Sequence, residues 1–309
     1  MNKHTSLRHL DMLTTAFGRD IDALLRDDQI IEIMVNPDGK LWVESLVKGK
    51  YFTGEILDIS ATLNVIKLVA ATRHVVVDML HPEIACDLPE NGARFQGWIP
   101  PISKSPTFSI RKKAIHIFTL DDYVSQSFLS EKQTDFLKKA INNKKNILIS
   151  GGTSSGKTTF ANALLNELKD IKDRVIVLED LPELQVAVAD CVTLRTSETK
   201  TMRDLVKGIL RMRPDRIIIG EVRDGAALEL LKAWNTGHPG GICTIHANSP
   251  EATISRLEDL ILEEVSVVPK RLIHEAIDVV VFMKREGDGR FMIQAISQFD
   301  EKNELVRIL

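Results

Sequence analysis

The sequence predicts an α/β protein in which a smaller α+β domain precedes a larger, mostly parallel sheet with helices on both faces. Three observations support this prediction. From residue 131 onward, short apolar runs alternate with segments of helical periodicity, as in parallel strands joined by helices. Residues 82–111 are instead interrupted by Pro and Gly, which is typical of hairpins. The chain has 309 residues, a length that favours about two domains.

The N-terminal domain begins with a helix and a hairpin. Residues 7–27 carry apolar side chains at helical spacing, and residues 30–35 form a strand-like run. The sequence Asn-Pro-Asp-Gly follows at 36–39, where Pro and Gly supply the backbone angles of a turn. Residues 40–46 are therefore expected to return as the second strand of the hairpin.

Further along, residues 59–71 predict a second helix, and the hairpins of 82–111 end the domain. The following stretch has no strong period and indicates a linker with one short helix. We therefore expect an α+β domain at 1–112, a linker at 113–130 and the larger domain at 131–309.

The larger domain shows the alternation most clearly. Its candidate strands are 146–150, 174–179, 191–194, 216–220 and 242–246. Its candidate helices are 131–142, 157–169, 201–212, 224–236 and 250–262. A last hairpin is expected from 276–284 and 290–299.

Composition and charge exclude several classes of protein. With 44% hydrophobic and 27% charged residues, the chain resembles an ordinary globular protein. Its 40 basic and 43 acidic residues are evenly spread, 14 against 16 in residues 1–125 and 26 against 27 in the rest. The charge therefore does not favour nucleic acid as a partner, although a local basic stripe stays open.

Cysteine usage suits a reducing cytoplasm, and hydropathy leaves peripheral attachment to a membrane open. The three cysteines stand far apart without a C-x-x-C pair, which argues against disulfides and against a cysteine zinc site. We expect no secretory signal peptide, because the first ten residues contain no apolar core. No apolar run approaches the length of a membrane-spanning helix.

Residues 151–158 read Gly-Gly-Thr-Ser-Ser-Gly-Lys-Thr, which fits the phosphate-binding pattern G-x-x-x-x-G-K-S/T without a mismatch. An apolar strand precedes this loop and a helix follows it, as the motif requires. We expect Lys157 to reach the β- and γ-phosphates, and the Thr158 hydroxyl to bind Mg²⁺. The candidate nucleotide-binding residues are Gly151, Gly152, Thr153, Ser154, Ser155, Gly156, Lys157, Thr158 and Thr159.

Two further strands end in acidic residues. The run at 216–220 is followed by Glu221, and the run at 175–178 by Glu179. Carboxyl ends of parallel strands meet at the edge of the sheet where ligands bind, so both carboxylates are candidates to bind Mg²⁺ or polarise water. The alternatives are a solvated acid at the end of a strand for Glu221 and a turn acid for Glu179.

His246 ends another predicted strand, where its imidazole could hydrogen-bond to a γ-phosphate. A core or surface histidine is the alternative. No pair of histidines has the spacing of a metal site with acids nearby.

These segments together resemble the secretion ATPases. The resemblance rests on Leu-Arg-Met-Arg-Pro-Asp-Arg at 210–216, Gly-Glu-Val-Arg at 220–223, and the segments 236–238 and 245–248. The segments 33–39 and 88–95 match as well, so the resemblance covers nearly the whole chain. It is strongest to the type IV secretion branch, and within it to the ATPases of conjugal transfer.

The resemblance implies a RecA-like P-loop core and a role for each motif. Residues 151–158 correspond to Walker A, Glu179 to the Asp box, Glu221 to the Walker B glutamate and His246 to the His box. It also singles out Arg94 and Arg111, whose guanidinium groups would stabilise charge on the γ-phosphoryl group; surface arginines are the alternative. The expected catalytic residues are Lys157, Glu179, Glu221, His246, Arg94 and Arg111. The expected Mg²⁺ ligands are Thr158, Glu179 and Glu221.

The resemblance further implies a homohexameric ATPase on the cytoplasmic face of the inner membrane, bound to inner-membrane components of a secretion or conjugation machine. Its cofactors would be ATP and Mg²⁺. The alternatives are a type II secretion or type IV pilus ATPase, a ring motor that translocates nucleic acid, and a nucleotide-gated scaffold with little turnover. The chain lacks the tetracysteine zinc module common in type II assembly ATPases.

Overall fold

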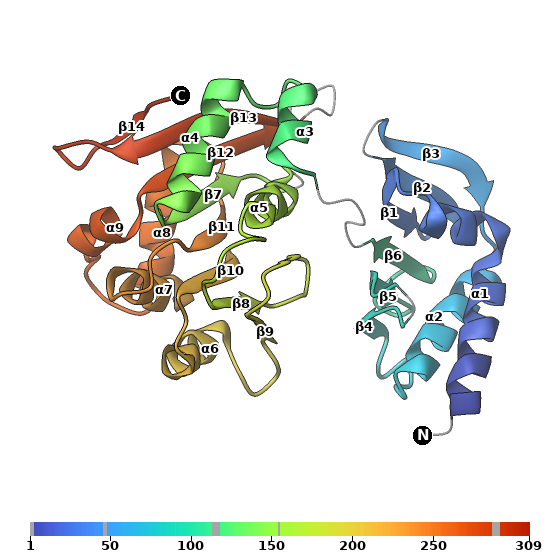
Figure 1. Cartoon of the computed structure of the whole chain (residues 1–309). Helices are drawn as coiled ribbons and strands as arrows, with labels where there is room; N and C mark the ends of the chain where they lie inside the picture. Colours follow the sequence, from blue (N-terminus) through green and yellow to red (C-terminus); the bar gives the residue numbers. More distant parts are fainter. Residues whose placement is uncertain (1–2, 46–47, 90, 113–117, 154, 286–290) are drawn as a thin grey trace. The chain divides into compact units, whose positions relative to one another are not determined.

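The structure is a computed structural model that describes residues 3–45, 48–89, 91–112, 118–153, 155–285 and 291–309, with the backbone alone for 3–11. The chain divides into two compact units, Met1–His116 and Ile117–Leu309, which we describe separately (Figure 1). Part of the predicted linker, the turn predicted at 285–289 beyond Arg285, and Ser154 lie outside the described residues.

The first unit is an antiparallel sheet with two helices. Its strand order is β3-β2-β1-β6-β5-β4 within the described residues. The strands are β1 (Ile30–Val35), β2 (Lys40–Ser45), β3 (Gly49–Ile56), β4 (Glu83–Asp87), β5 (Arg94–Trp98) and β6 (Thr107–Arg111). The helices are α1 (Lys3–Arg26), interrupted at Gly18, and α2 (Ile59–Thr72). The predicted α+β character is confirmed.

The core of this unit follows the alternation of its strands. Ile33, Val35, Leu41 and Val43 are at most 1% exposed, because every second side chain of β1 and β2 points to the same face. The helix α2 places Val65, Ile66 and Val69 in the same cluster. Each of these burials stabilises the unit by about 2 kcal/mol.

The second unit is a mixed sheet whose centre is parallel. Its strand order is β14-β13-β12-β7-β11-β10-β8-β9 within the described residues. The parallel strands are β12 (Val279–Arg285), β7 (Ile147–Gly151), β11 (Ile242–His246), β10 (Arg216–Val222), β8 (Val175–Glu179) and β9 (Cys191–Arg195). The antiparallel strands β13 (Phe291–Phe299) and β14 (Leu305–Arg307) extend one edge.

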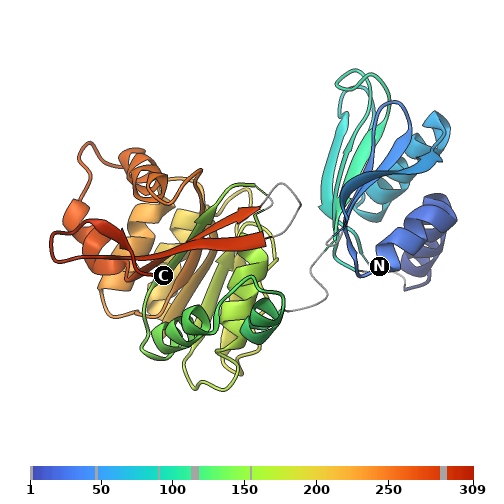
Figure 2. The same cartoon turned by 90° about the horizontal axis from the view of Figure 1, so that it is seen from above.

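Helices cover both faces of this sheet, as the alternation predicts. One layer consists of α3 (Leu120–Ser125), α4 (Glu131–Asn142) and α5 (Lys157–Asn166). The other consists of α6 (Met202–Ile209) with the short 3₁₀ turn η1 (Leu210–Met212), α7 (Ala226–Asn235), α8 (Ala252–Leu262) and α9 (Lys270–Ala276). Figure 2 shows the two layers on opposite sides of the sheet, α3 to α5 in green and α7 to α9 in orange.

Three elements were not predicted. The strand β3 lies at a sheet edge and none of its residues is buried, so its sequence shows no clean alternation of apolar and polar residues. The helix α9 spans only seven residues, and β14 only three. Segments this short carry too few periodic positions to stand out in a sequence.

Candidate nucleotide site

The glycine loop runs from the end of β7 to the start of α5. Gly151 has a φ of 154°, and a Cβ there would collide with the carbonyl oxygen of Met283. Gly156 has a φ of 85°, and a Cβ there would lie 3.1 Å from Cδ1 of Phe291. Glycine adopts these angles without strain, so the geometry of the loop requires glycine at both positions.

Lys157 is the first residue of α5, and its side chain turns back into the loop. Its Nζ donates hydrogen bonds to the carbonyl oxygens of Gly151 at 2.9 Å and of Gly152 at 2.8 Å. Burial lowers the pKa of Lys157, the Glu221 carboxylate opposes this shift, and the Arg223 guanidinium adds to it. The amine is thus held beside the glycine loop, where a phosphate group would be its natural counter-ion.

The other predicted loop residues differ in their exposure. The Ser155 hydroxyl is buried, and no hydrogen bond from the described residues reaches it. A buried polar atom without a partner is costly, and it fits a site that a ligand completes. Gly152, Thr158 and Thr159 are half-buried, and Thr153 is exposed. Ser154 lies outside the described residues.

Two of the predicted strand-end residues meet beside the loop. His246 at the end of β11 is the register partner of Gly151. Its Nε2 lies 3.0 Å from Oε1 of Glu221 on the neighbouring strand β10. This oxygen is buried and accepts no hydrogen bond of proper geometry from the described residues. The pair therefore leaves one carboxylate oxygen of Glu221 with capacity to bind a water or a ligand.

The surroundings of His246 favour its neutral imidazole. Burial lowers its pKa first, followed by the positive charge of Lys157, while Glu221 acts in the opposite direction. Since an ordinary histidine titrates at about 6.5, a lowered pKa leaves the ring uncharged at neutral pH. A neutral ring can still donate one hydrogen bond.

Arg223 holds the other oxygen of Glu221. Its Nε lies 2.6 Å and its Nη2 2.5 Å from Oε2. Burial acts to lower the pKa of Arg223, but the hydrogen bond and charge of Glu221, with the charges of Asp180 and Glu183, outweigh it and raise that pKa. The guanidinium is therefore the counter-ion of several acids at this edge of the sheet.

Glu179 ends β8 and turns into the protein. The residue is 2% exposed, and its Oε1 accepts hydrogen bonds from the backbone N–H groups of Glu183 at 2.8 Å and Leu184 at 2.7 Å. The carboxylate thus anchors the loop that follows β8. Its predicted catalytic and metal-binding roles stay predictions.

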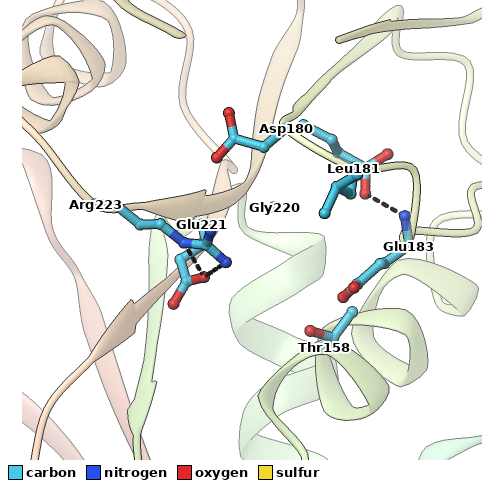
Figure 3. A pocket seen from close by; sticks show the side chains of 8 residues that line it. Thr158, Asp180, Leu181, Glu183, Gly220, Glu221 and Arg223 are labelled. Atoms are coloured by element: carbon cyan, nitrogen blue, oxygen red, sulfur yellow. Dashed lines mark hydrogen bonds and ion pairs between the residues drawn. The ribbon is translucent and has the colours of Figure 1, made fainter. Parts of the chain in front are cut away.

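One pocket brings these elements together (Figure 3). It is lined by Thr158, Glu179, Asp180, Leu181, Glu183, Gly220, Glu221 and Arg223. Thr158, Glu179 and Glu221 were predicted site residues, whereas Arg223 was not. Arg223 lies two positions after Glu221, and this spacing at the end of a strand places two side chains on the same side. That spacing is the signal in the sequence that would have found it.

The two predicted arginines of the first unit lie side by side. Arg94 on β5 and Arg111 on β6 are register partners in an antiparallel pair, and both are exposed. Nη2 of Arg111 lies 3.5 Å from Oε2 of Glu32. Their role at the nucleotide stays a prediction.

A glycine loop between a parallel strand and a helix, with a buried lysine and acids at neighbouring strand ends, defines a P-loop nucleotide-binding protein. The chain belongs to the type II/IV secretion system protein family, whose model matches residues 54–286. The resemblance to secretion proteins predicted from the motifs is confirmed.

Individual proteins agree with this assignment. The chain is 45% identical over 280 residues to a probable conjugal transfer protein TrbB of Sinorhizobium fredii, covering 90% of this chain and 86% of the relative. The VirB11 ATPase of the Brucella suis type IV secretion system, solved with sulphate, is 25% identical, with a TM-score of 0.51 and coverage of 96% and 97%. The Legionella pneumophila ATPase DotB shares the fold, with a TM-score of 0.67, 20% identity and coverage of 98% and 82%.

Proposed function

We propose that this chain is the ATPase motor of a type IV secretion system that serves conjugal transfer. The observation that carries the proposal is the position of Lys157 in the glycine loop, within electrostatic reach of Glu221, whose Oε1 is buried and has capacity for a ligand. The names of the relatives support the biological setting, since TrbB is a conjugal transfer protein and VirB11 an ATPase of type IV secretion.

Each side chain has a role in the proposed hydrolysis. Lys157 exchanges its carbonyl partners for phosphate oxygens, and neutral His246 donates a hydrogen bond to the γ-phosphate. Glu221 orients a water molecule, whose oxygen bonds to the γ-phosphorus. The bond from this phosphorus to the β,γ-bridging oxygen breaks, and ADP leaves with the electron pair. The proton of the water passes through Glu221 to the released phosphate.

Mg²⁺ fits the residues present. The Thr158 hydroxyl and the carboxylates of Glu179 and Glu221 line one pocket and are the hard oxygen donors that Mg²⁺ prefers. Among the described residues, no three His, Cys, Asp or Glu side chains form a metal-binding group by themselves. Thr158 and one carboxylate would therefore hold the ion together with nucleotide phosphates and water. When bound, Mg²⁺ neutralises charge on the transferred phosphoryl group.

We also propose a homohexameric ring that docks on inner-membrane components at the cytoplasmic face, with Arg94 and Arg111 contributing to the nucleotide site. This proposal rests on the resemblance to secretion ATPases. In the part of the chain that the structure describes, no helix is long and apolar enough to cross a membrane.

The test is Mg²⁺-dependent ATP hydrolysis by the full chain, fractionated by size, beside Lys157→Ala. Lys145→Ala is the matched control, because Lys145 precedes β7 at its opposite end, where it pairs with Asp278 at 2.7 Å. We expect activity in a high-mass fraction, lost in Lys157→Ala and kept in the control. Tight ATP binding without turnover would instead favour a nucleotide-gated scaffold, and strong stimulation by DNA a nucleic-acid motor.

A further inference from the structure

Arg223 is the cation in a pocket that is otherwise acidic. The carboxylates that line this pocket belong to Glu179, Asp180, Glu183 and Glu221. Among the described residues that line the pocket, only Glu221 contacts the guanidinium directly, through two nitrogens on the same oxygen (Figure 3). The direct contact is therefore made to one oxygen of one acid, while Asp180 and Glu183 act on the guanidinium through their charge.

The two oxygens of Glu221 stand in different surroundings. Oε2 is fixed by Nε and Nη2 of Arg223, whereas Oε1 is buried, lies 3.0 Å from His246 Nε2 and accepts no well-directed hydrogen bond. A carboxylate held at one oxygen by two points of a planar group cannot rotate freely about its last torsion. The orientation of Oε1 is thus set by the contact at Oε2.

We infer that Arg223 is a positioning residue, which grips Oε2 of Glu221 so that Oε1 stays turned toward the attacking water. The inference rests on the proposed ATPase function. Arg223 acts through Glu221 and not on the nucleotide, since the glycine loop and Lys157 already provide the donors for phosphate. Its side chain is 58% exposed, so the contact with Glu221 is the main interaction to be lost on substitution.

The experiment is a double-mutant cycle. Arg223→Gln is introduced into the wild type and into Glu221→Gln, and ATP hydrolysis is measured under steady-state and single-turnover conditions. A fluorescent ATP analogue reports binding affinity. In the wild-type background we expect kcat to fall by about 10²-fold, because misplacing a catalytic group by about 1 Å costs that much. KM and the Kd of the analogue should stay within about two-fold of the wild-type values, because substitutions at independent sites affect each other by no more than about this factor.

The cycle separates positioning from direct action. In the Glu221→Gln background, Arg223→Gln should change the single-turnover rate by less than about two-fold, because the residue through which it acts is already disabled. An equal loss of the hydrolysis rate in both backgrounds would show that Arg223 contacts the phosphates and would overturn the inference. A loss of affinity for ATP in Arg223→Gln that exceeds its loss of affinity for ADP would show the same. Arg223→Lys keeps the positive charge but loses the planar guanidinium with its two contacting nitrogens. It should therefore recover only part of the wild-type rate of hydrolysis.

A matched control removes a similar pair elsewhere. Nε of Arg271 lies 2.6 Å from Oε1 of Glu275 on helix α9, where the Arg271 side chain is 90% exposed and neither residue lines the pocket. Arg271→Gln should retain the wild-type rate. A fully active Arg223→Gln would refute the inference while leaving the proposed function intact. Absence of hydrolysis in the wild type would overturn both.

Discussion

Glu179 is expected to stabilise the second unit, because its carboxylate anchors the loop after β8. Glu179→Ala removes the acceptor of two backbone N–H groups, those of Glu183 and Leu184. Leaving a buried donor without a partner costs about 1–3 kcal/mol. Both residues are half-buried, so water reaches the loop and the lower end of that range applies. At about 1 kcal/mol for each of the two donors, we expect a loss of about 2 kcal/mol in the free energy of unfolding.

Glu179→Gln should cost about half as much. The amide of Gln keeps one carbonyl oxygen at the position of Oε1, so both N–H groups retain an acceptor. Hydrogen bonds to a charged acceptor are about twice as strong as neutral ones, which leaves a loss of about 1 kcal/mol. Comparing the two variants separates the stability that comes from having a hydrogen-bond acceptor at Oε1 from the stability that comes from its negative charge. If Glu179 also binds Mg²⁺, the Gln variant will be stable but deficient in hydrolysis.

Urea unfolding followed by the fluorescence of Trp234 is the assay. This tryptophan is 3% exposed in the core of the second unit, and replacing Trp42 and Trp98 with Phe makes it the sole reporter. Glu183→Gln is the control, because it changes a pocket acid without removing an acceptor from the loop. Coincident unfolding curves for Glu179→Ala and the wild type would refute the reasoning.

Two further predictions concern titration and reactivity. Burial and Lys157 lower the folded-state pKa of His246. The neutral imidazole therefore contributes to the free energy of unfolding above the unfolded-state pKa of about 6.5, and this contribution is lost as pH falls through the folded-state pKa. Between about pH 7 and about pH 5 the wild type should therefore lose more unfolding free energy than His246→Gln; equal losses in urea titrations would contradict this. Cys243 is fully buried, and burial raises the pKa of its thiol. A thiol reagent should modify half-buried Cys86 and Cys191 in the native protein but Cys243 only after unfolding, and rapid native labelling of Cys243 would count against its burial.

Much of the fold follows from local patterns in the sequence. The strands β7, β8 and β10 read as continuous apolar runs because both faces of a parallel sheet are covered, and nearly all of their residues are buried. The helix predicted to end at residue 212 ends three residues earlier, at Ile209 in α6, and the last three residues form η1 instead. Arg213, with a φ of 56°, then stops the chain from continuing as a helix before Pro214.

Some residues of the site could be predicted from local sequence, and others could not. Gly151, Gly156 and Lys157 could be predicted because a phosphate loop imposes fixed residues at fixed spacing. Arg94 and Arg111 came from the family resemblance alone, and their catalytic role is still a prediction. No local pattern could reveal the ring of Phe291 against Gly156, because the two residues are 135 positions apart in the sequence. The pairing of β12 with β7 and β13 brings them together.

The sequence by itself determined the order of elements, the glycine loop and the strand ends that carry acids, because these depend on residue type and spacing along the chain. Only the tertiary structure decided what each carboxylate does. Glu179 turns inward to bind loop amides, whereas Glu221 is held between Arg223 and His246. Both acids end apolar strands and look alike in sequence. Their difference arises from the neighbouring strands and loops, whose hydrogen-bond donors and charges are set by the packing of the sheet.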